Sequence, residues 1–247
     1  MKPVVKWVGG KRQIIQKLLA LAPSDFNKYY EPFVGGGAML LNLKPKSFVI
    51  NDINSELIDM YNCLSNKNKL QKLLNLCDEH QKNHSEQYFY QIRELDRKPN
   101  YQNLSEPEKV ARLIYLNKTG FNGLYRVNLQ GFFNVPYGKR EKFSLYEKDN
   151  VEQILDYFKK SNFQIKNTDY KNAIKGAESG DFVYFDPPYD VITKTTFKSY
   201  SKYDFAQEQQ IELANTFKTL SKKVLNVCYL ITIHLWLENY IKILIFM

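Results

Sequence analysis

The sequence predicts an α/β protein built on an open sheet, with a helical lobe inserted into it. Three features indicate this fold: an apolar strand at 182–185 that ends in Asp186, a glycine loop at 35–37 between a strand and a helix, and a polar helical stretch from 66 to about 107. Open α/β sheets bind ligands at the carboxyl ends of their strands. The chemistry is therefore expected at those ends.

The strand that ends in Asp186 is followed by Pro187, Pro188 and Tyr189. Two prolines cannot continue a strand ladder, so the chain leaves the sheet at Asp186. Asp186 and the carbonyl of Pro187 could accept the two N–H bonds of an exocyclic base amine and prepare it to attack a methyl donor. Tyr189 could stack on a base flipped out of a duplex. The competing interpretation is a strand-end turn with a surface Asp and a packed Tyr.

The segment 6–12 contains two glycines ahead of a basic pair and an amphipathic helix. Backbone can approach a ligand closely at glycine. Trp7 could cover an adenine or a carboxylate site, and Lys11 could pair with an anionic group. A plain glycine turn before a basic helix explains the segment equally well.

Gly35, Gly36 and Gly37 lie between a strand and a helix that begins near Met39. The glycine spacing of dinucleotide folds is absent, and so is a phosphate-binding lysine-serine pair, so a nucleoside without a pyrophosphate fits better. Asp52 follows the strand at 48–50, where an acidic residue commonly accepts ribose hydroxyls. Asp52 could instead cap the helix at 56–64.

Aromatic, asparagine, glycine and cationic residues interleave between 117 and 140. This composition suits DNA reading, with Arg on guanine, Asn on adenine, cations on phosphate and an aromatic wedge between base steps. A glycine-rich hairpin with exposed cations is the alternative. Lys and Arg number 35 against 26 Asp and Glu, a net charge of +9 that weakly favours a polyanionic partner.

Three cysteines and three histidines show no metal-ligand spacing, so no metal site is expected. Residues 1–20 lack a signal-peptide core, and polar residues interrupt the apolar stretch 224–247 too often for a membrane span. A cytoplasmic protein is the resulting prediction.

Six motifs occur in a defined order: Lys-Trp-x-Gly-Gly-Lys at 6–11, Glu-Pro-Phe-Val-Gly-Gly-Gly at 31–37, Asn-Asp-Ile-Asn at 51–54, Phe-Asn-Gly-Leu-Tyr-Arg at 121–126, Phe-Asn-Val-Pro-Tyr-Gly at 133–138 and Asp-Pro-Pro-Tyr at 186–189. With them the chain resembles the alpha-group DNA adenine-N6 methyltransferases, the Dam and DpnII-type family, over about residues 4–223. The resemblance implies a Rossmann-like S-adenosylmethionine-dependent methyltransferase sheet, mainly parallel, with an inserted target-recognition lobe.

The resemblance also implies site residues and domains. The catalytic positions would be Asp186, Pro187, Pro188 and Tyr189. The cofactor, S-adenosyl-L-methionine, would be bound by Trp7, Lys11, Phe33, Gly35, Gly36, Gly37, Asp52 and Asp186. Double-stranded DNA would be contacted by Phe121, Asn122, Leu124, Arg126, Pro136 and Lys139. The catalytic domain would comprise 1–65 and 145–223, and the recognition lobe 66–144. The implied activity is adenine-N6 methylation in GATC, with a cognate restriction endonuclease as a candidate partner.

Two departures from the family pattern stand out. Phe132 occupies a position where the family usually has Glu, in the segment expected to discriminate sequences. After Lys223 the sequence no longer follows the pattern of the family. Shifting the reading frame of the back-translated sequence by one nucleotide restores much of that pattern. We therefore expect residues 224–247 to be a frameshifted tail that leaves an unpaired edge on the sheet and little or no activity.

Two other functions remain open from the residues. A related Asp-Pro-Pro-Tyr site could methylate another planar amine, in RNA or in protein glutamine, although the segment 117–140 argues against this. The altered tail favours a remnant that binds DNA or cofactor without turnover. Specific DNA binding without methyl transfer would identify such a remnant.

Overall fold

The computed structural model describes residues 1–11, 13–188, 212, 213, 215, 216, 219, 220, 226–235 and 238–246. Tyr189, the polar loop predicted at 193–203 and most of the helix predicted at 205–220 lie outside this set. The described chain divides into two compact units. The helical unit holds 1–10 and 55–159, and the sheet unit holds 11–54, 160–188 and the described residues from 212 onward.

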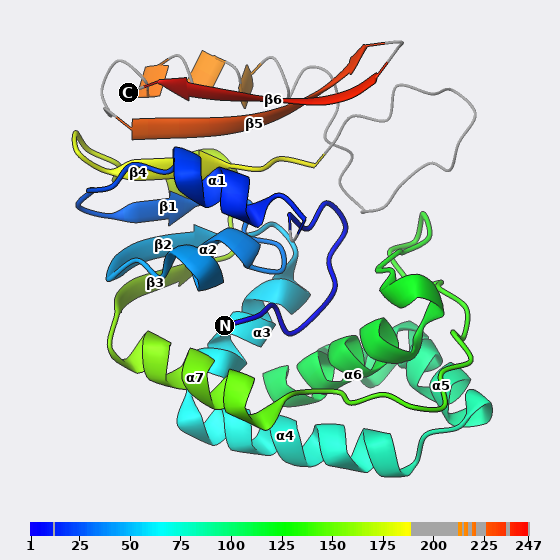
Figure 1. The fold of residues 1–247 in the computed structure, drawn as a ribbon. Coiled ribbons are helices and arrows are strands. Elements are labelled where there is room, and N and C mark those ends of the chain that lie inside the picture. Colours follow the sequence, from blue (N-terminus) through cyan, green and yellow to red (C-terminus); the bar gives the residue numbers. More distant parts are fainter. Residues whose placement is uncertain are drawn as a thin grey trace. The chain divides into compact units, whose positions relative to one another are not determined.

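The sheet unit contains six strands: β1 (Tyr29–Glu31), β2 (Ser47–Asn51), β3 (Asn162–Lys166), β4 (Phe182–Phe185), β5 (Asn226–Leu235) and β6 (Glu238–Phe246). Their order across the sheet is β3-β2-β1-β4-β5-β6 (Figure 1). Neighbouring strands are parallel from β3 to β5, and β6 runs antiparallel to β5. The predicted α/β class with a mainly parallel sheet is confirmed.

The strand order reverses at β1. From β1 the chain builds outward through β2 to β3, and it then returns to place β4 on the other side of β1. Such a reversal opens a crevice at the carboxyl ends of the two central strands, because their connections leave in opposite directions. By this topology, the loops after Glu31 and after Phe185 are the ones expected to flank a ligand.

The tail does not leave the edge of β4 unpaired. Residues Phe182 to Phe185 pair in parallel register with residues Asn226 to Tyr229 of β5. The expectation of an unpaired edge was therefore wrong, because the tail is rich in the β-branched and aromatic residues that favour strands whatever the origin of the sequence. A frameshifted origin of the tail stays a prediction about the gene.

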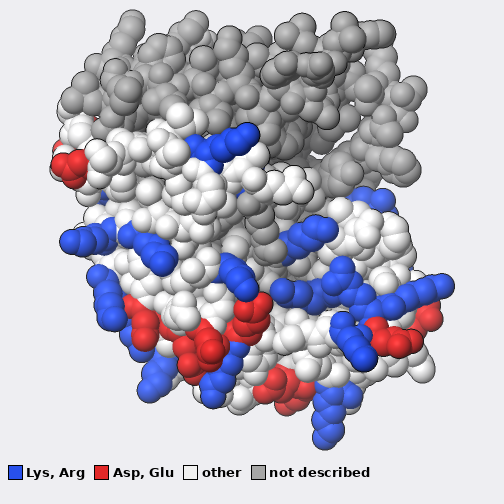
Figure 2. All heavy atoms as spheres, in the orientation of Figure 1, with Lys and Arg blue, Asp and Glu red and all other residues white. Residues whose placement is uncertain are grey.

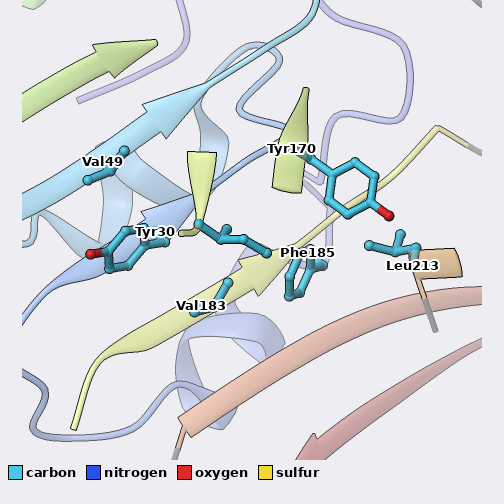
Figure 3. Close-up of a cluster of buried hydrophobic side chains, with 7 residues drawn as sticks. Tyr30, Val49, Tyr170, Val183, Phe185 and Leu213 are labelled. Carbon is cyan, nitrogen blue, oxygen red and sulfur yellow. The ribbon is translucent and has the colours of Figure 1, made fainter. Parts of the chain in front are cut away.

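The core of the sheet unit is visible in Figure 3. Tyr30, Val49 and Val183 lie opposite one another in register on β1, β2 and β4, and strand alternation puts Phe185 on the same face. The side chains of Tyr170, Ile174 and Leu213 pack with the residues of this face in one buried cluster. The elements with described bounds in this unit also include the short helices α1 (Ile15–Leu21), α2 (Ala38–Leu43) and α8 (Tyr170–Ala173).

The helical unit contains α3 (Ser55–Ser65), α4 (Lys67–Lys82), α5 (Glu86–Arg93), α6 (Glu106–Thr119) and α7 (Lys148–Lys159), with the 3₁₀ turns η1 (Glu94–Arg97), η2 (Pro99–Asn103) and η3 (Phe121–Gly123). Local sequence caps three of these helices. Asn66 and Ser85 cap α4 and α5 through their side chains, and Ser105 and Glu108 form a capping box at α6. None of the helices in the described ranges is long and apolar enough to cross a membrane.

The helical stretch predicted from 66 onward is confirmed as α4, α5 and α6. The unit extends further than that stretch, because α3 packs against α4, α6 and α7. Residues 55–65 and 145–159 therefore group with the helices in space. The functional limits of 66 and 144 for a recognition lobe stay a prediction.

Candidate active site and nucleic-acid interface

The glycine loop after β1 is a turn that only flexible residues can make. Gly35 and Gly37 have φ values of 49° and 73°, in the left-handed region where a side chain would be strained. The loop closes on itself through the Gly37 amide, which donates to the Val34 carbonyl at 2.8 Å. It therefore presents bare backbone at the carboxyl end of β1.

Asp52 ties this loop to the end of β2. One carboxylate oxygen accepts the Gly35 amide at 3.0 Å, and the other accepts the Asn54 amide at 2.9 Å. Burial raises the pKa of Asp52 to about 6, although both amides favour the ionised form. A carboxylate has about four acceptor sites, so the amides of Gly35, Asn54 and Ile53 leave acceptor capacity for a ribose hydroxyl.

Asn51, immediately before Asp52, fastens three strand ends together. Its side-chain amide donates to the Pro32 and Thr168 carbonyls, both at 3.0 Å, and its oxygen accepts the Thr168 amide at 3.0 Å. The Asn51 carbonyl also accepts the Val34 amide at 2.9 Å. Asn51 therefore positions the loop after β1, and the sequence motif alone did not reveal this role.

Glu31 is a second residue that the sequence did not single out. It is 3% exposed, and one of its carboxylate oxygens accepts both the Tyr29 hydroxyl at 2.9 Å and the Leu40 amide at 3.1 Å. Burial, with smaller contributions from the charges of Asp186 and Asp52, raises the pKa of Glu31 to about 8 against the lowering effect of its two hydrogen bonds. Asp186 and Asp52 are thus close enough to Glu31 to influence its ionisation.

Asp186 follows β4, as predicted, and its partner is Lys11. The Lys11 ammonium lies 2.7 Å from an Asp186 carboxylate oxygen, and the two side chains are 7% and 17% exposed. Burial raises the pKa of Asp186, while Lys11 and, more weakly, Tyr184 act to lower it. The anionic group that Lys11 was expected to pair with is, in this structure, the candidate catalytic carboxylate.

The remaining predicted residues of the sheet unit take different positions. Pro187 is buried and Pro188 is exposed, which fits a chain leaving the sheet after Asp186. Phe33 is half-buried, with its ring stacked on Tyr170 at 5.4 Å and 30°. Gly36 is part of the turn described above. Tyr189 lies outside the described residues, so its predicted stacking role stays a prediction.

The residues predicted to meet DNA share one arm of the helical unit, residues 120–139. Two isolated bridges, Gly120↔Tyr137 and Val127↔Phe133, bring the two halves of this arm together. Phe121 is 51% exposed, and its amide donates to the Pro136 carbonyl at 2.9 Å. All six predicted positions are exposed or half-buried: Phe121, Asn122, Leu124, Arg126, Pro136 and Lys139.

Arg126 is held in a fixed orientation by Asn134. The Arg126 Nε donates to the Asn134 side-chain oxygen at 2.7 Å, and one terminal nitrogen donates to the Asn134 carbonyl at 3.3 Å. A guanidinium carries five N–H groups, so donors remain for a guanine edge. In Figure 2, lysine and arginine side chains project from much of the described surface of the face shown, with carboxylates between several of them.

Phe132, the departure from the family pattern, has a local partner. The Arg97 guanidinium lies 5.4 Å from the centre of its ring. Arg97 also donates to the Phe133 carbonyl at 3.0 Å and pairs with Asp96 at 2.9 Å. Phe132 therefore packs on the body of the helical unit.

Trp7 lies in the helical unit, where its ring packs against the ring of Tyr125, with centroids 4.6 Å apart and planes tilted by 33°. The predicted cofactor residues are thus divided, with Trp7 in one unit and the glycine loop, Asp52, Lys11 and Asp186 in the other. The described part of the chain contains no group of three or more His, Cys, Asp or Glu residues arranged to hold a metal ion.

Comparison with known proteins shows the family of the chain. The family model of the D12 class N6 adenine-specific DNA methyltransferases matches residues 7–241. The chain is 41% identical to the type II methyltransferase M1.LlaDCHI of Lactococcus lactis over 90% of its own length and 78% of the relative. It is 37% identical to the type II methyltransferase M.MjaIII of Methanocaldococcus jannaschii, over 90% and 81% of the two chains. It is 33% identical to the DNA adenine methylase of Escherichia coli K12, over 89% and 76%. The chain therefore belongs to the D12 class of N6 adenine-specific DNA methyltransferases and is an adenine-specific DNA methyltransferase.

Proposed function

We propose that the chain transfers a methyl group from S-adenosylmethionine to the N6 amine of an adenine flipped out of duplex DNA, within the sequence GATC. The observation that carries this proposal is the placement of Asp186 and the glycine loop on either side of the reversal point of the sheet. Ligands of open α/β sheets bind at such a point.

The residues at the reversal point fit the nucleoside part of the cofactor. Gly35 and Gly37 expose backbone without a side chain to block a ligand, and Asp52 lies at the next strand end with unused acceptor sites. Phe33 offers a half-exposed aromatic ring beside the loop. Together these groups would hold the adenosine.

The charges fit as well. Glu31, Asp52 and Asp186 all have raised pKa values, and part of the rise at Glu31 comes from the other two carboxylates. A cationic ligand at this point would relieve that repulsion. Bound S-adenosylmethionine would supply the electrophilic methyl group on its sulfonium. The acidic surroundings therefore favour a cation over a phosphate-bearing ligand.

The proposed catalytic role of Asp186 is orientation of the amine. The lone pair of an adenine amine is delocalised into the ring, so the amine is a weak nucleophile. Asp186 and the Pro187 carbonyl would each accept one N–H bond, which turns the lone pair toward the methyl donor. The prolines hold both acceptors rigidly. After transfer the amine loses one proton, and the Asp186 carboxylate or solvent accepts it.

Lys11 supports this role by keeping Asp186 ionised. A buried carboxylate without a partner would take up a proton and would become a weaker acceptor for the N–H bond of the amine. The 2.7 Å pair with Lys11 offsets that tendency. The acidic limb of the activity profile is expected above the ordinary pKa of Asp, because burial raises the pKa of Asp186.

Recognition of GATC is proposed from the arm at 120–139. Support comes from the oriented guanidinium of Arg126, which suits a guanine edge, and from the exposed ring of Phe121, which suits insertion between base steps. Lys139 is exposed and suits a phosphate contact. A cognate restriction endonuclease is a proposed partner, and the cytoplasm stays the predicted compartment.

Methyl transfer from labelled S-adenosylmethionine to a GATC duplex and to a scrambled duplex tests the proposal. We expect label in the GATC duplex, none in the scrambled duplex, and none from the Asp186→Ala variant. Replacing the target adenine with 2-aminopurine reports flipping, because its fluorescence rises when it leaves the stack. Label in both duplexes would refute the proposed sequence preference, and fluorescence that stays quenched would refute flipping.

The alternative is the remnant that binds without turnover. Specific binding of the GATC duplex with no label transferred by the wild-type chain would establish this alternative. A variant with the restored reading frame, assayed in parallel with the wild-type chain, tests the effect of residues 224–247 on activity separately. Activity in the frame-restored variant alone would assign the loss to residues 224–247.

A further inference from the structure

Two segments far apart in the sequence meet inside the helical unit, and one side chain joins them. Asn117, near the end of α6, is 1% exposed. Its oxygen accepts the Lys6 amide at 2.8 Å, and its nitrogen donates to the Lys6 carbonyl at 2.8 Å and to the Gly123 carbonyl at 3.1 Å. The single amide thus satisfies both backbone groups of Lys6 and anchors the turn that follows α6.

Further contacts join the same segments. The Lys6 ammonium donates to the Asn122 carbonyl at 2.7 Å, and the Trp7 ring packs against the Tyr125 ring. Gly123, at φ 64°, allows the close approach, since a Cβ there would lie 3.1 Å from the Lys6 side chain. Residues 6–7 and 122–125 are therefore held against each other by backbone, charge and ring contacts.

The hydroxyl of Tyr125 fixes the other side of this assembly. It donates to a Glu56 carboxylate oxygen at 3.0 Å, and Glu56 also accepts the Tyr101 hydroxyl at 2.7 Å. Arg112, 2% exposed, lies 3.6 Å from Glu56. The ring beneath Trp7 is thus tied to the buried polar network of the helical unit.

We propose that Asn117 is a positioning residue that holds the Trp7 segment and the DNA-reading turn at 121–126 in one arrangement. The inference rests on the proposed function, because it takes the turn at 121–126 to bind DNA and Trp7 to be a cofactor-binding residue. Asparagine suits the position because it offers an acceptor and two donors on one short side chain. Aspartate has the same shape but cannot donate, so Asn117→Asp leaves the Lys6 and Gly123 carbonyls without this donor.

The proposal predicts a specific kinetic pattern. Removing the hydrogen bonds of Asn117 should weaken the binding of the duplex by the turn at 121–126 and the binding of the cofactor by Trp7. Asp186 belongs to the sheet unit and should keep its position. The KM for the duplex should rise about tenfold or more in Asn117→Asp, since two buried hydrogen bonds are lost. The KM for S-adenosylmethionine should rise too, and kcat at saturation should change by less than about threefold. Partial misfolding would instead lower kcat and leave both KM values unchanged.

Asn117→Asp is compared with Asn75→Asp, the same change at an exposed position on α4. Should Asn117→Asp fail to fold, Lys6→Met removes only the exposed bond to Asn122, and Tyr125→Phe removes only the hydroxyl bond to Glu56. Each should raise the duplex KM about threefold. Melting curves of all variants check the fold.

The outcomes separate the positioning role from the proposed function. Raised KM values with kcat retained support the role of Asn117. Unchanged KM values in all three variants of an active wild-type enzyme would overturn it and leave the proposed function standing. If the wild-type chain transfers no methyl group, duplex binding measured by fluorescence anisotropy replaces KM. Equal affinities of wild type and variants would again overturn the role.

Discussion

Glu31 makes the stability of the sheet unit depend on pH in an unusual direction. Its folded pKa of about 8 exceeds its ordinary value of 4.5. Below about pH 4 Glu31 is protonated in both the folded and the unfolded chain, so its ionisation does not lower the free energy of unfolding there. As the pH rises, the unfolded chain ionises first and is favoured. Stability should therefore fall until the pH passes the folded pKa.

The magnitude follows from the two pKa values. Between about pH 5 and about pH 7 the linkage relation gives a loss of about 2.5 kcal/mol from Glu31. Glu31→Gln should abolish this loss. Its amide oxygen can still accept both the Tyr29 hydroxyl and the Leu40 amide, because one oxygen accepts both bonds in the wild-type chain. The variant should therefore gain stability relative to wild type as the pH rises.

Urea unfolding of wild type and Glu31→Gln at several pH values between about 5 and 8 measures the difference. Asp52 and Asp186 titrate in both proteins, so their contributions largely cancel. Glu147→Gln, at a side chain 67% exposed, is the control and should show no comparable gain. Parallel pH curves for wild type and Glu31→Gln would refute the reasoning, since they would mean that Glu31 titrates near its ordinary pKa.

Three further predictions follow from single contacts. Lys11→Met removes the cation 2.7 Å from Asp186 and should shift the acidic limb of kcat/KM to higher pH; an unshifted profile would contradict the pairing. Arg112→Met breaks a buried pair with Asp96 at 2.7 Å and should destabilise the fold by about 3 to 5 kcal/mol in urea unfolding, whereas a loss under about 1 kcal/mol would show that the network is not needed. Asn134→Ala frees Arg126 and should raise the duplex KM about tenfold with the cofactor KM unchanged; a matching rise in both would place Asn134 elsewhere in the mechanism.

Much of the site was predictable because strand ends are local features. A glycine loop after one strand, Asp52 after the next and Asp186 before two prolines can each be recognised in a short window. Parallel strands bring their carboxyl ends to one edge, so the three groups had to lie near one another. The structure places the glycine loop and Asp186 at the reversal between β1 and β4 and Asp52 at the end of the neighbouring β2, and the charges of Asp186 and Asp52 both act on Glu31.

The partners of these groups were not predictable in the same way. Lys11 and Asp186 are separated by most of the chain, and no local pattern links them. Asn51 and Asn117 act through backbone groups brought close only by folding. A signal did exist for Asn117, since it is a polar residue directly after the apolar run at 113–116 of α6. The strands of the tail were missed because the tail was interpreted through its departure from the family and not through its own strand propensity.

The central claim is adenine-N6 methylation directed by Asp186. The most direct test is digestion of a methylated GATC duplex to nucleosides and identification of the methylated product by mass spectrometry. We expect N6-methyldeoxyadenosine from the wild-type reaction and none from Asp186→Ala. Methylcytosine in the product, or N6-methyldeoxyadenosine at the wild-type level from Asp186→Ala, would contradict the account.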